Sequence, residues 1–140
     1  MSLYKTILVT LEGTPTDRAI IEHIIALAQA MKSRVVLLHV ASGVPAKYHR
    51  TDAAGKEVEE STVFLGRVRD EFTAVGIPAE AQLAYGEPAK EIVNWVQQNG
   101  CDLVAMSTHG HKFVADLVLG TTAFEVQHSL RVPVLLLRAK

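Results

Sequence analysis

Five short apolar runs alternate in this chain with stretches of helical periodicity, and this alternation limits the folds that the chain can adopt. The runs Val35–Leu38 and Val134–Leu137 are continuously apolar and do not alternate with polar residues. Such runs are typical of strands covered on both faces, as in a parallel sheet. We therefore expect five strands, at Thr6–Thr10, Arg34–Val40, Ala79–Tyr85, Asp102–Met106 and Pro133–Leu137.

Helix start and stop signals lie between these runs. The segment Thr14–Asp17 offers an N-cap threonine, a proline at the first helical position and an acid at the third. A second helix should end at Gly76, and a third should run from Pro88 to Asn99. A fourth should run from about Thr122 to Leu130, since Thr122 and Glu125 have capping-box spacing. In the first two helices the residues expected to face inward are Ala19, Ile20, His23, Ile24, Leu27, Ala28, Met31, Val58, Leu65, Val68, Phe72 and Val75.

Strands that alternate with helices and return by right-handed crossovers form a doubly wound α/β domain. We predict three layers, with helices on both faces of a five-stranded parallel sheet in the order 3-2-1-4-5. The length of 140 residues fits one domain, residues 1–140. The segment Ala41–Gly55 lacks periodicity and is expected to form a loop at the edge where ligands enter.

The composition excludes several classes of partner. The chain has 14 Lys and Arg against 15 Asp and Glu, so its net charge of −1 provides no footprint for nucleic acid or an anionic membrane. No apolar run approaches the roughly 20 residues of a membrane span. Cys101 is the only cysteine, so no intrachain disulfide can form. We expect a cytoplasmic protein with no nucleic-acid or membrane partner.

A ligand of such a sheet binds beyond the carboxyl ends of the strands, where the strand order reverses. The predicted order places this crevice between the first and fourth strands, with the loops Thr10–Pro15 and Ser107–Thr122 beside it. Gly120-Thr121-Thr122 opens a helix, whose free amides and dipole favour an anion such as phosphate. From spacing alone, a phosphate site and glycines that only shape a turn and a helix start are equally supported.

Several segments, taken in order, resemble the universal stress protein family over nearly the whole chain: Tyr4–Val9, Leu37–Val40, Tyr85–Pro88 and Val132–Leu137. The nucleotide-binding members of this family carry Gly-x2-Gly-x9-Gly-[Ser/Thr] after the fourth strand. Gly110, Gly120 and Thr121 fit this spacing, with Ser107 in place of the first glycine. The resemblance implies a fold of the adenine nucleotide alpha hydrolase type. It also implies a stress-response protein that binds ATP, ADP or AMP, with Mg²⁺ as an accompanying ion.

The resemblance further implies where the nucleotide contacts the chain. Thr10, Leu11 and Glu12 would lie against the nucleoside, and the backbone at Val40 would read the adenine edge. The phosphates would lie near the segment after the fourth strand and the start of the last helix, at Ser107, Thr108, His109, Gly110, His111, Gly120, Thr121 and Thr122. Gly86, from the family's Gly-x-Pro turn, completes the set. A homodimer is implied as well, through antiparallel pairing of Pro133–Leu137.

Three departures from the family pattern keep alternatives open. Ser107 adds a hydroxyl, Glu12 replaces the usual aspartate, and Phe113 puts a bulky ring in a loop where the family uses small residues. One alternative is a non-nucleotide, dimeric interaction module of the same fold. The other is a flavin carrier, because Thr10, Gly13, Thr14 and Thr16 partly match a threonine-rich phosphate loop after the first strand.

The sequence predicts no catalytic residues. His109 and His111 lack a third ligand nearby, so no metal site is expected. Glu12, Asp116 and the two histidines form no nucleophile–base pair, which leaves at most slow ATP hydrolysis. Elsewhere Cys101 is expected to be an inert thiol, Trp95 a packing residue, and His23 and His39 satisfied structural histidines.

Overall fold

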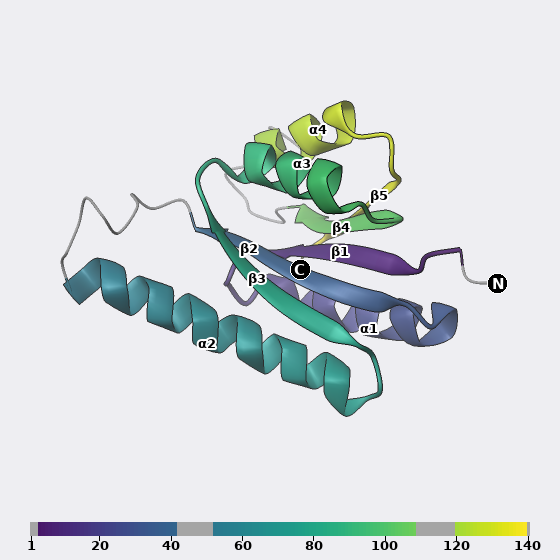
Figure 1. Ribbon diagram of the computed structural model, residues 1–140. Coiled ribbons are helices and arrows are strands. Elements are labelled where there is room, and N and C mark those ends of the chain that lie inside the picture. The colour runs from purple at the N-terminus through teal and green to yellow at the C-terminus, as the bar shows by residue number, and fades with distance from the viewer. Residues whose placement is uncertain (1–2, 42–51, 109–119, 140) are drawn as a thin grey trace.

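The computed structural model describes residues 3–41, 52–108 and 120–139; at residues 52–57, 120 and 121 it describes the backbone alone. The elements alternate along the chain (Figure 1). The strands are β1 (Thr6–Leu11), β2 (Arg34–Ala41), β3 (Ala79–Tyr85), β4 (Leu103–Thr108) and β5 (Val134–Arg138). The helices are α1 (Asp17–Met31), α2 (Asp52–Ala74), α3 (Pro88–Asn99) and α4 (Gly120–Ser129).

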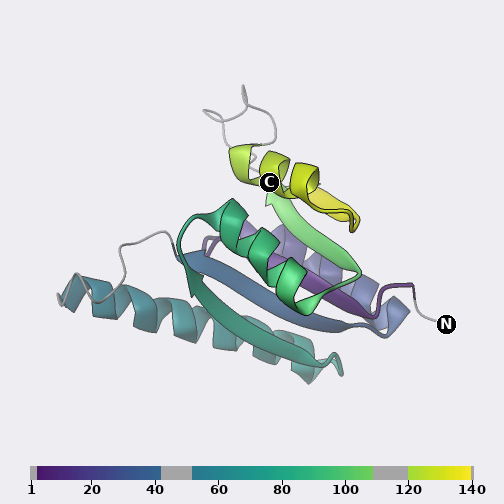
Figure 2. The same ribbon diagram turned by 45° about the horizontal axis from the view of Figure 1, so that its top comes forward.

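The sheet has the order β3-β2-β1-β4-β5, and all neighbouring strands run parallel. Helices α1 and α2 cover one face, and α3 and α4 lie side by side on the other (Figures 1 and 2). The predicted three-layer α/β fold and strand order are confirmed. Each strand lies within two residues of its expected bounds at either end.

Two apolar cores, one on each face of the sheet, explain the continuous apolar runs. Ile7 and Val9 of β1 pack into the core beneath α1 and α2, whereas Leu8 packs into the core beneath α3 and α4. Phe72 of α2 is fully buried in the first core and Val126 of α4 in the second. Because successive strand residues point to opposite faces, both sides of a central strand must be apolar.

Several expected helix features are wrong. Helix α1 begins at Asp17, so Thr14 and Pro15 belong to the turn before it, in which the Asp17 amide donates to the Thr14 carbonyl at 3.0 Å. Helix α4 begins at Gly120, which places Thr122 inside its first turn and not at the N-cap.

Two residues expected to face the core are exposed. Val75 is 45% exposed because α2 ends at Ala74, where the helical spacing stops; Ile77 is buried instead. His23 is exposed because the buried stripe of α1 consists of Asp17, Ile20, Ile21, Ile24 and Ala28. His23 is therefore not a buried structural histidine.

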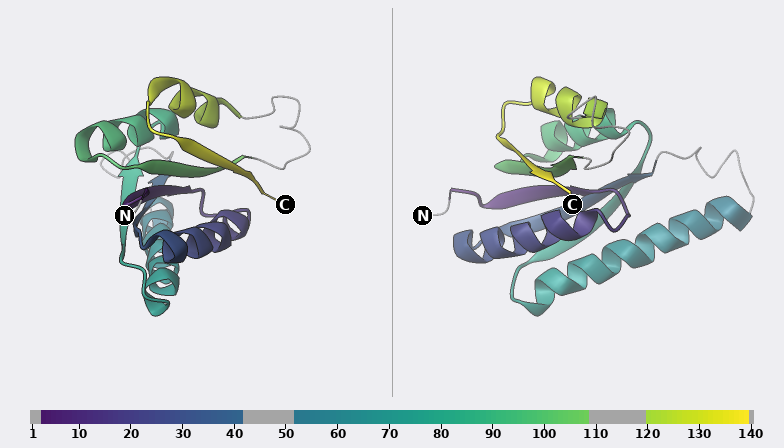
Figure 3. Two further views of the ribbon diagram at one scale, coloured as in Figure 1. Left: turned by 90° about the vertical axis from the view of Figure 1, so that its right-hand side faces the viewer. Right: turned by 180° about the vertical axis from the view of Figure 1, so that it is seen from behind.

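Two further features concern the outline of the molecule. The first turns of α2 extend past the carboxyl ends of the strands (Figures 1 and 3). Within residues 3–41, 52–108 and 120–139, no helix has the length and hydropathy needed to cross a membrane.

The contrast between Phe72 and Val75 gives a stability test. We expect Phe72→Ala to lower the free energy of unfolding by about 3–5 kcal/mol, because it leaves a cavity in a packed core. Val75→Ala should change it by less than about 0.5 kcal/mol, because that side chain is largely in solvent. Urea unfolding followed by circular dichroism measures both values; equal losses for the two variants would contradict the assignment of the core.

Candidate functional site

The sheet opens between β1 and β4 at the carboxyl ends of the strands. The two strands pair only from Ile7 with Leu103 to Val9 with Ala105. Each then continues beside its other neighbour, β1 to Leu11 along β2 and β4 to Thr108 along β5. The pairing of β1 with β4 therefore stops at the predicted switch point, where an open α/β sheet binds its ligands.

The structure brings six of the predicted site residues to this edge of the sheet: Thr10, Leu11, Glu12, Val40, Ser107 and Thr108. Leu11 is buried in the core on the α1 side, whereas Val40 packs against the core on the α3 side. Thr108 is nearly buried, and its carbonyl accepts the Ala139 amide at 3.1 Å. Glu12 is exposed. The edge thus combines apolar side chains with strand backbone, which suits a flat heterocycle.

Ser107 carries a buried hydroxyl near the carboxyl end of β4. Its Oγ atom has no hydrogen-bond partner among the residues that the structure describes. A buried hydroxyl without a partner costs about 1–3 kcal/mol. Ser107 is therefore a described polar side chain at this edge whose capacity to form hydrogen bonds is unmet.

The loop from β1 to α1 is held by a buried carboxylate. Asp17, 1% exposed, accepts hydrogen bonds from the amides of Glu12 (2.9 and 3.1 Å), Gly13 (2.7 Å) and Thr14 (3.3 Å). Burial raises the pKa of this carboxyl, although the three amides and the charge of His39 act in the opposite direction. Sequence reasoning took Asp17 only for an acid in the first turn of a helix and missed this role.

His39 supports the same loop from β2. Its Nδ1 atom lies 2.8 Å from the carbonyl oxygen of Leu11. Gly13 has φ = +82°, and a Cβ added there would lie 3.4 Å from the His39 ring. The expectation that His39 is a structural histidine is confirmed, and the positive φ favours glycine at position 13.

Gly86 lies away from the opening between β1 and β4. It follows β3, the outer strand, and its amide donates to the Ala41 carbonyl at 3.1 Å. Its φ of +133° and the 3.1 Å separation between an added Cβ and Oε2 of Glu91 explain the glycine by backbone geometry. A contact between Gly86 and a ligand stays a prediction.

The predicted phosphate-binding residues are only partly described. His109, Gly110 and His111 lie outside the described residues, as does Phe113. The backbone of Gly120, Thr121 and Thr122 forms the first turn of α4, so this glycine does open a helix, although Thr122 is not its N-cap. The start of a helix presents amides and the positive end of its dipole, so an anion can bind there.

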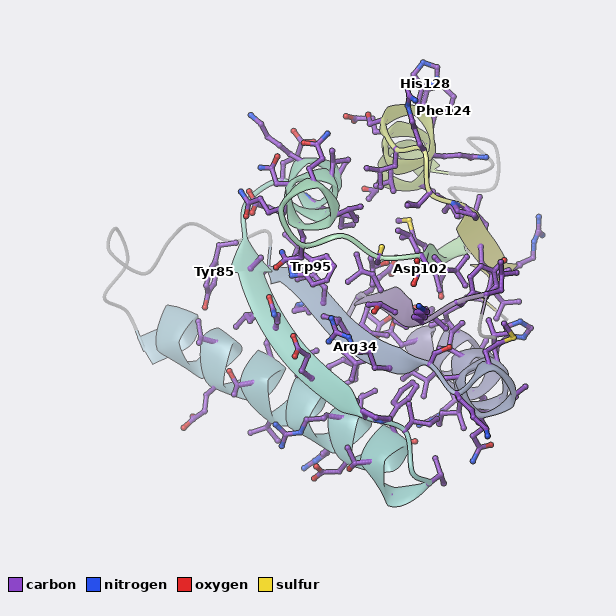
Figure 4. All side chains as sticks on the ribbon, turned by 45° about the vertical axis from the view of Figure 1, so that its right-hand side comes forward. Arg34, Tyr85, Trp95, Asp102, Phe124 and His128 are labelled. Atoms are coloured by element: carbon purple, nitrogen blue, oxygen red, sulfur yellow. The ribbon has the colours of Figure 1, made fainter. Side chains whose placement is uncertain are left out.

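Other polar and reactive residues are placed elsewhere. Cys101 precedes β4 at the opposite end of the sheet, and burial raises the pKa of its thiol, which disfavours the reactive thiolate. Trp95 points from α3 toward β3 (Figure 4), where its Nε1 donates to Oε1 of Gln82 at 3.0 Å. Within the described part of the chain, no three His, Cys, Asp or Glu side chains are grouped to hold a metal ion.

Comparison of sequences matches residues 3–138 to the universal stress protein family. A universal stress protein of Thermus aquaticus is 30% identical over 97% of this chain and 100% of its own length. The universal stress protein YxiE of Bacillus subtilis is 24% identical over 97% of this chain and 100% of its own length.

Comparison of structures gives the same fold. The protein MJ0577, solved for structure-based assignment of its biochemical function, has a TM-score of 0.84 and 26% identity; the match covers 99% of this chain and 98% of that one. A universal stress protein in complex with cAMP has a TM-score of 0.73, 17% identity and 98% coverage of both chains. One from Archaeoglobus fulgidus in complex with dAMP has a TM-score of 0.70 and 18% identity, over 96% of this chain and 98% of that one.

Proposed function

This chain belongs to the universal stress protein family, and from that membership we propose that it binds an adenine nucleotide, ATP by preference, at the opening between β1 and β4. We propose further that it does so as a single domain over residues 1–140, in a cytoplasmic homodimer that serves stress adaptation. The observation that carries the proposal is the separation of β1 from β4 beyond Val9 and Ala105. The relatives solved with cAMP and dAMP support an adenine nucleotide as the class of ligand.

The proposal gives each side of the opening its own part of the nucleotide. Thr10, Leu11 and the backbone at Val40 would contact the nucleoside, and Glu12 would face the ribose hydroxyls. Ser107 would use its buried hydroxyl to bond the ligand. The phosphates would lie at the first turn of α4, where the amides of Gly120, Thr121 and Thr122 begin the helix.

A flavin carrier is the weaker alternative. It needs free amides after β1 to hold a phosphate, but the amides of Glu12, Gly13 and Thr14 already donate to Asp17. Pro15 has no amide hydrogen to add. The remaining alternative, an interaction module that binds no nucleotide, is an outcome of the first test below.

Nucleotide content and affinity test the proposal. Denatured protein should release ATP, ADP or AMP near one per chain, or the purified protein should bind ATP with Mg²⁺ in calorimetric titration. Gly120→Val should abolish this binding, because a branched side chain at the start of α4 obstructs the approach of the phosphates. Gly66→Val is the matched control, because an added Cβ at Gly66 in α2 meets nothing within 4 Å.

Two results would count against this assignment. A protein that is purified empty and ignores added ATP is an interaction module and not a nucleotide-binding protein. Unchanged affinity in the Gly120→Val protein would remove the start of α4 from the site.

The homodimer is expected at the β5 edge of the sheet. Val134, Leu135, Leu136 and Leu137 are half-buried there, whereas the opposite edge strand, β3, carries Glu80 and Gln82. An apolar strand at the edge of a sheet tends to pair with a strand of another chain. We expect Leu137→Lys to shift the protein toward monomer in analytical ultracentrifugation, while Leu83→Lys on β3 leaves the dimer intact. A wild-type monomer, or equal effects of the two substitutions, would exclude this interface.

We propose that binding acts as a switch and not as a catalytic step. The expected loop 41–55 is shorter in the structure, because Ala41 ends β2 and residues 52–55 begin α2. Nucleotide would change the conformation between β4 and α4, and between β2 and α2 with it, and so change the surface that a partner meets. Residues 42–51 and 109–119 lie outside the described part of the chain. Saturating ATP should slow amide hydrogen exchange in both segments; unchanged exchange in both would end the switch hypothesis.

A further inference from the structure

Every backbone amide of the loop from β1 to α1 has a partner inside the chain. The amides of Glu12, Gly13 and Thr14 donate to the Asp17 carboxylate. Pro15 has no amide hydrogen, and the Thr16 amide donates to Oγ1 of Thr14 at 3.3 Å. The amides of Asp17 and Arg18 donate to the carbonyls of Thr14 and Pro15 at 3.0 and 3.1 Å. The loop therefore has no backbone amide left for a ligand.

Consecutive amides just before a helix ordinarily form an anion site, because their hydrogens converge and the helix dipole adds positive potential. Here the anion is part of the chain. The carboxylate of Asp17 is almost completely buried and uses both of its oxygens on these amides. Its negative charge, with that of the exposed Glu12 next to it, opposes a second anion at this side of the opening.

Among the described residues, the charge of His39 acts on the Asp17 carboxylate, but no arginine or lysine forms an ion pair with it. The guanidinium of Arg18 turns away to Glu71 on α2, at 2.6 Å, and to Glu22, at 3.3 Å. His39 uses Nδ1 on the Leu11 carbonyl. Across the opening, the first turn of α4 begins at Gly120 and includes no acidic residue. The β1 side of the opening therefore carries negative charge, whereas the α4 side presents the positive end of a helix dipole.

We propose that Asp17 is a positioning residue: its carboxylate fills the anion site after β1 and excludes phosphate from it, so that a nucleotide binds with its phosphates toward α4. The exclusion of phosphate depends on this loop alone. The orientation of the nucleotide rests on the proposed function.

The first experiment tests the exclusion with inorganic phosphate as the probe, by titration followed in amide NMR spectra. In the wild-type protein the amide signals of Glu12, Gly13 and Thr14 should not move. In Asp17→Ser, which removes the charge and all but one acceptor, the same three signals should shift and saturate. Asp17→Asn keeps an acceptor oxygen without the charge, so it gives a second folded protein if the serine variant unfolds, and a smaller saturable shift is expected.

Asp102→Ser is the matched control. The Asp102 carboxylate also accepts two backbone amides, those of Lys5 at 3.0 Å and Thr6 at 2.9 Å, but at the opposite end of the sheet. This variant should lose stability without gaining any phosphate response at Glu12, Gly13 or Thr14. The exclusion is overturned if folded Asp17 variants show no response at these amides, or if the wild-type amides respond to phosphate.

The second experiment tests the orientation with ATP bearing Mn²⁺, whose unpaired electrons broaden nearby amide signals. In the wild-type protein the signals of Thr122 and Ala123 should be lost while that of Gly13 remains, and Mn²⁺ without ATP should leave all three. Loss of the Gly13 signal instead would overturn the orientation while confirming that nucleotide binds. If ATP causes no change anywhere, the proposed function and the orientation fail together, and the phosphate titration still decides whether Asp17 excludes anions.

Discussion

The burial of β1, β2 and β4 between two helical layers is the constraint on which the other features of this molecule depend. A strand covered on both faces must be apolar along its whole length, as Ile7, Leu8 and Val9 are. Helix α1, which follows β1, lies on one face of the sheet, and α4, which follows β4, lies on the other (Figure 3). In an open α/β sheet, two adjacent strands whose following helices lie on opposite faces mark the switch point. The opening beyond Val9 and Ala105 is thus a consequence of the layered sheet and not an addition to it.

The same constraint explains how much of the fold the sequence predicts. Continuous apolar runs and helical spacing are signals of long range, so strand order and layers follow from them. The residues at which a helix or strand ends depend on individual contacts, which leave no periodic pattern in the sequence. Helical spacing predicted an inward-facing Val75, but α2 ends one residue earlier and Ile77 enters the core in its place. The prediction that His23 faces inward was wrong for a related reason. The buried stripe of α1 includes Ile21 and Ile24, which leaves His23 on the exposed side of the helix.

Some features of the site could likewise be predicted from the sequence, whereas others are seen only in the structure. The switch point and the residues around it could be predicted from strand order, and the structure gathers Thr10, Val40 and Ser107 at that edge. Asp17 could not be recognised in advance. An acid in the first turn is ordinary for a helix, and its contact with the amide of Glu12, five residues earlier, depends on a tight turn that the letters do not reveal.

Asp17 and Ser107 show two opposite uses of a buried polar group beside one opening. The carboxylate of Asp17 accepts backbone amides of its own chain, so it holds the loop on the β1 side and leaves those amides unavailable to a ligand. The hydroxyl of Ser107 has no partner among the described residues, so on the β4 side a polar group still has bonding capacity. A buried polar group without a partner is costly, whereas a group that already has its partners gains little from one more. A polar ligand therefore gains more from a bond on the β4 side than on the β1 side. Hydrogen bonding and charge therefore both direct the polar part of a ligand away from β1 and toward β4 and α4.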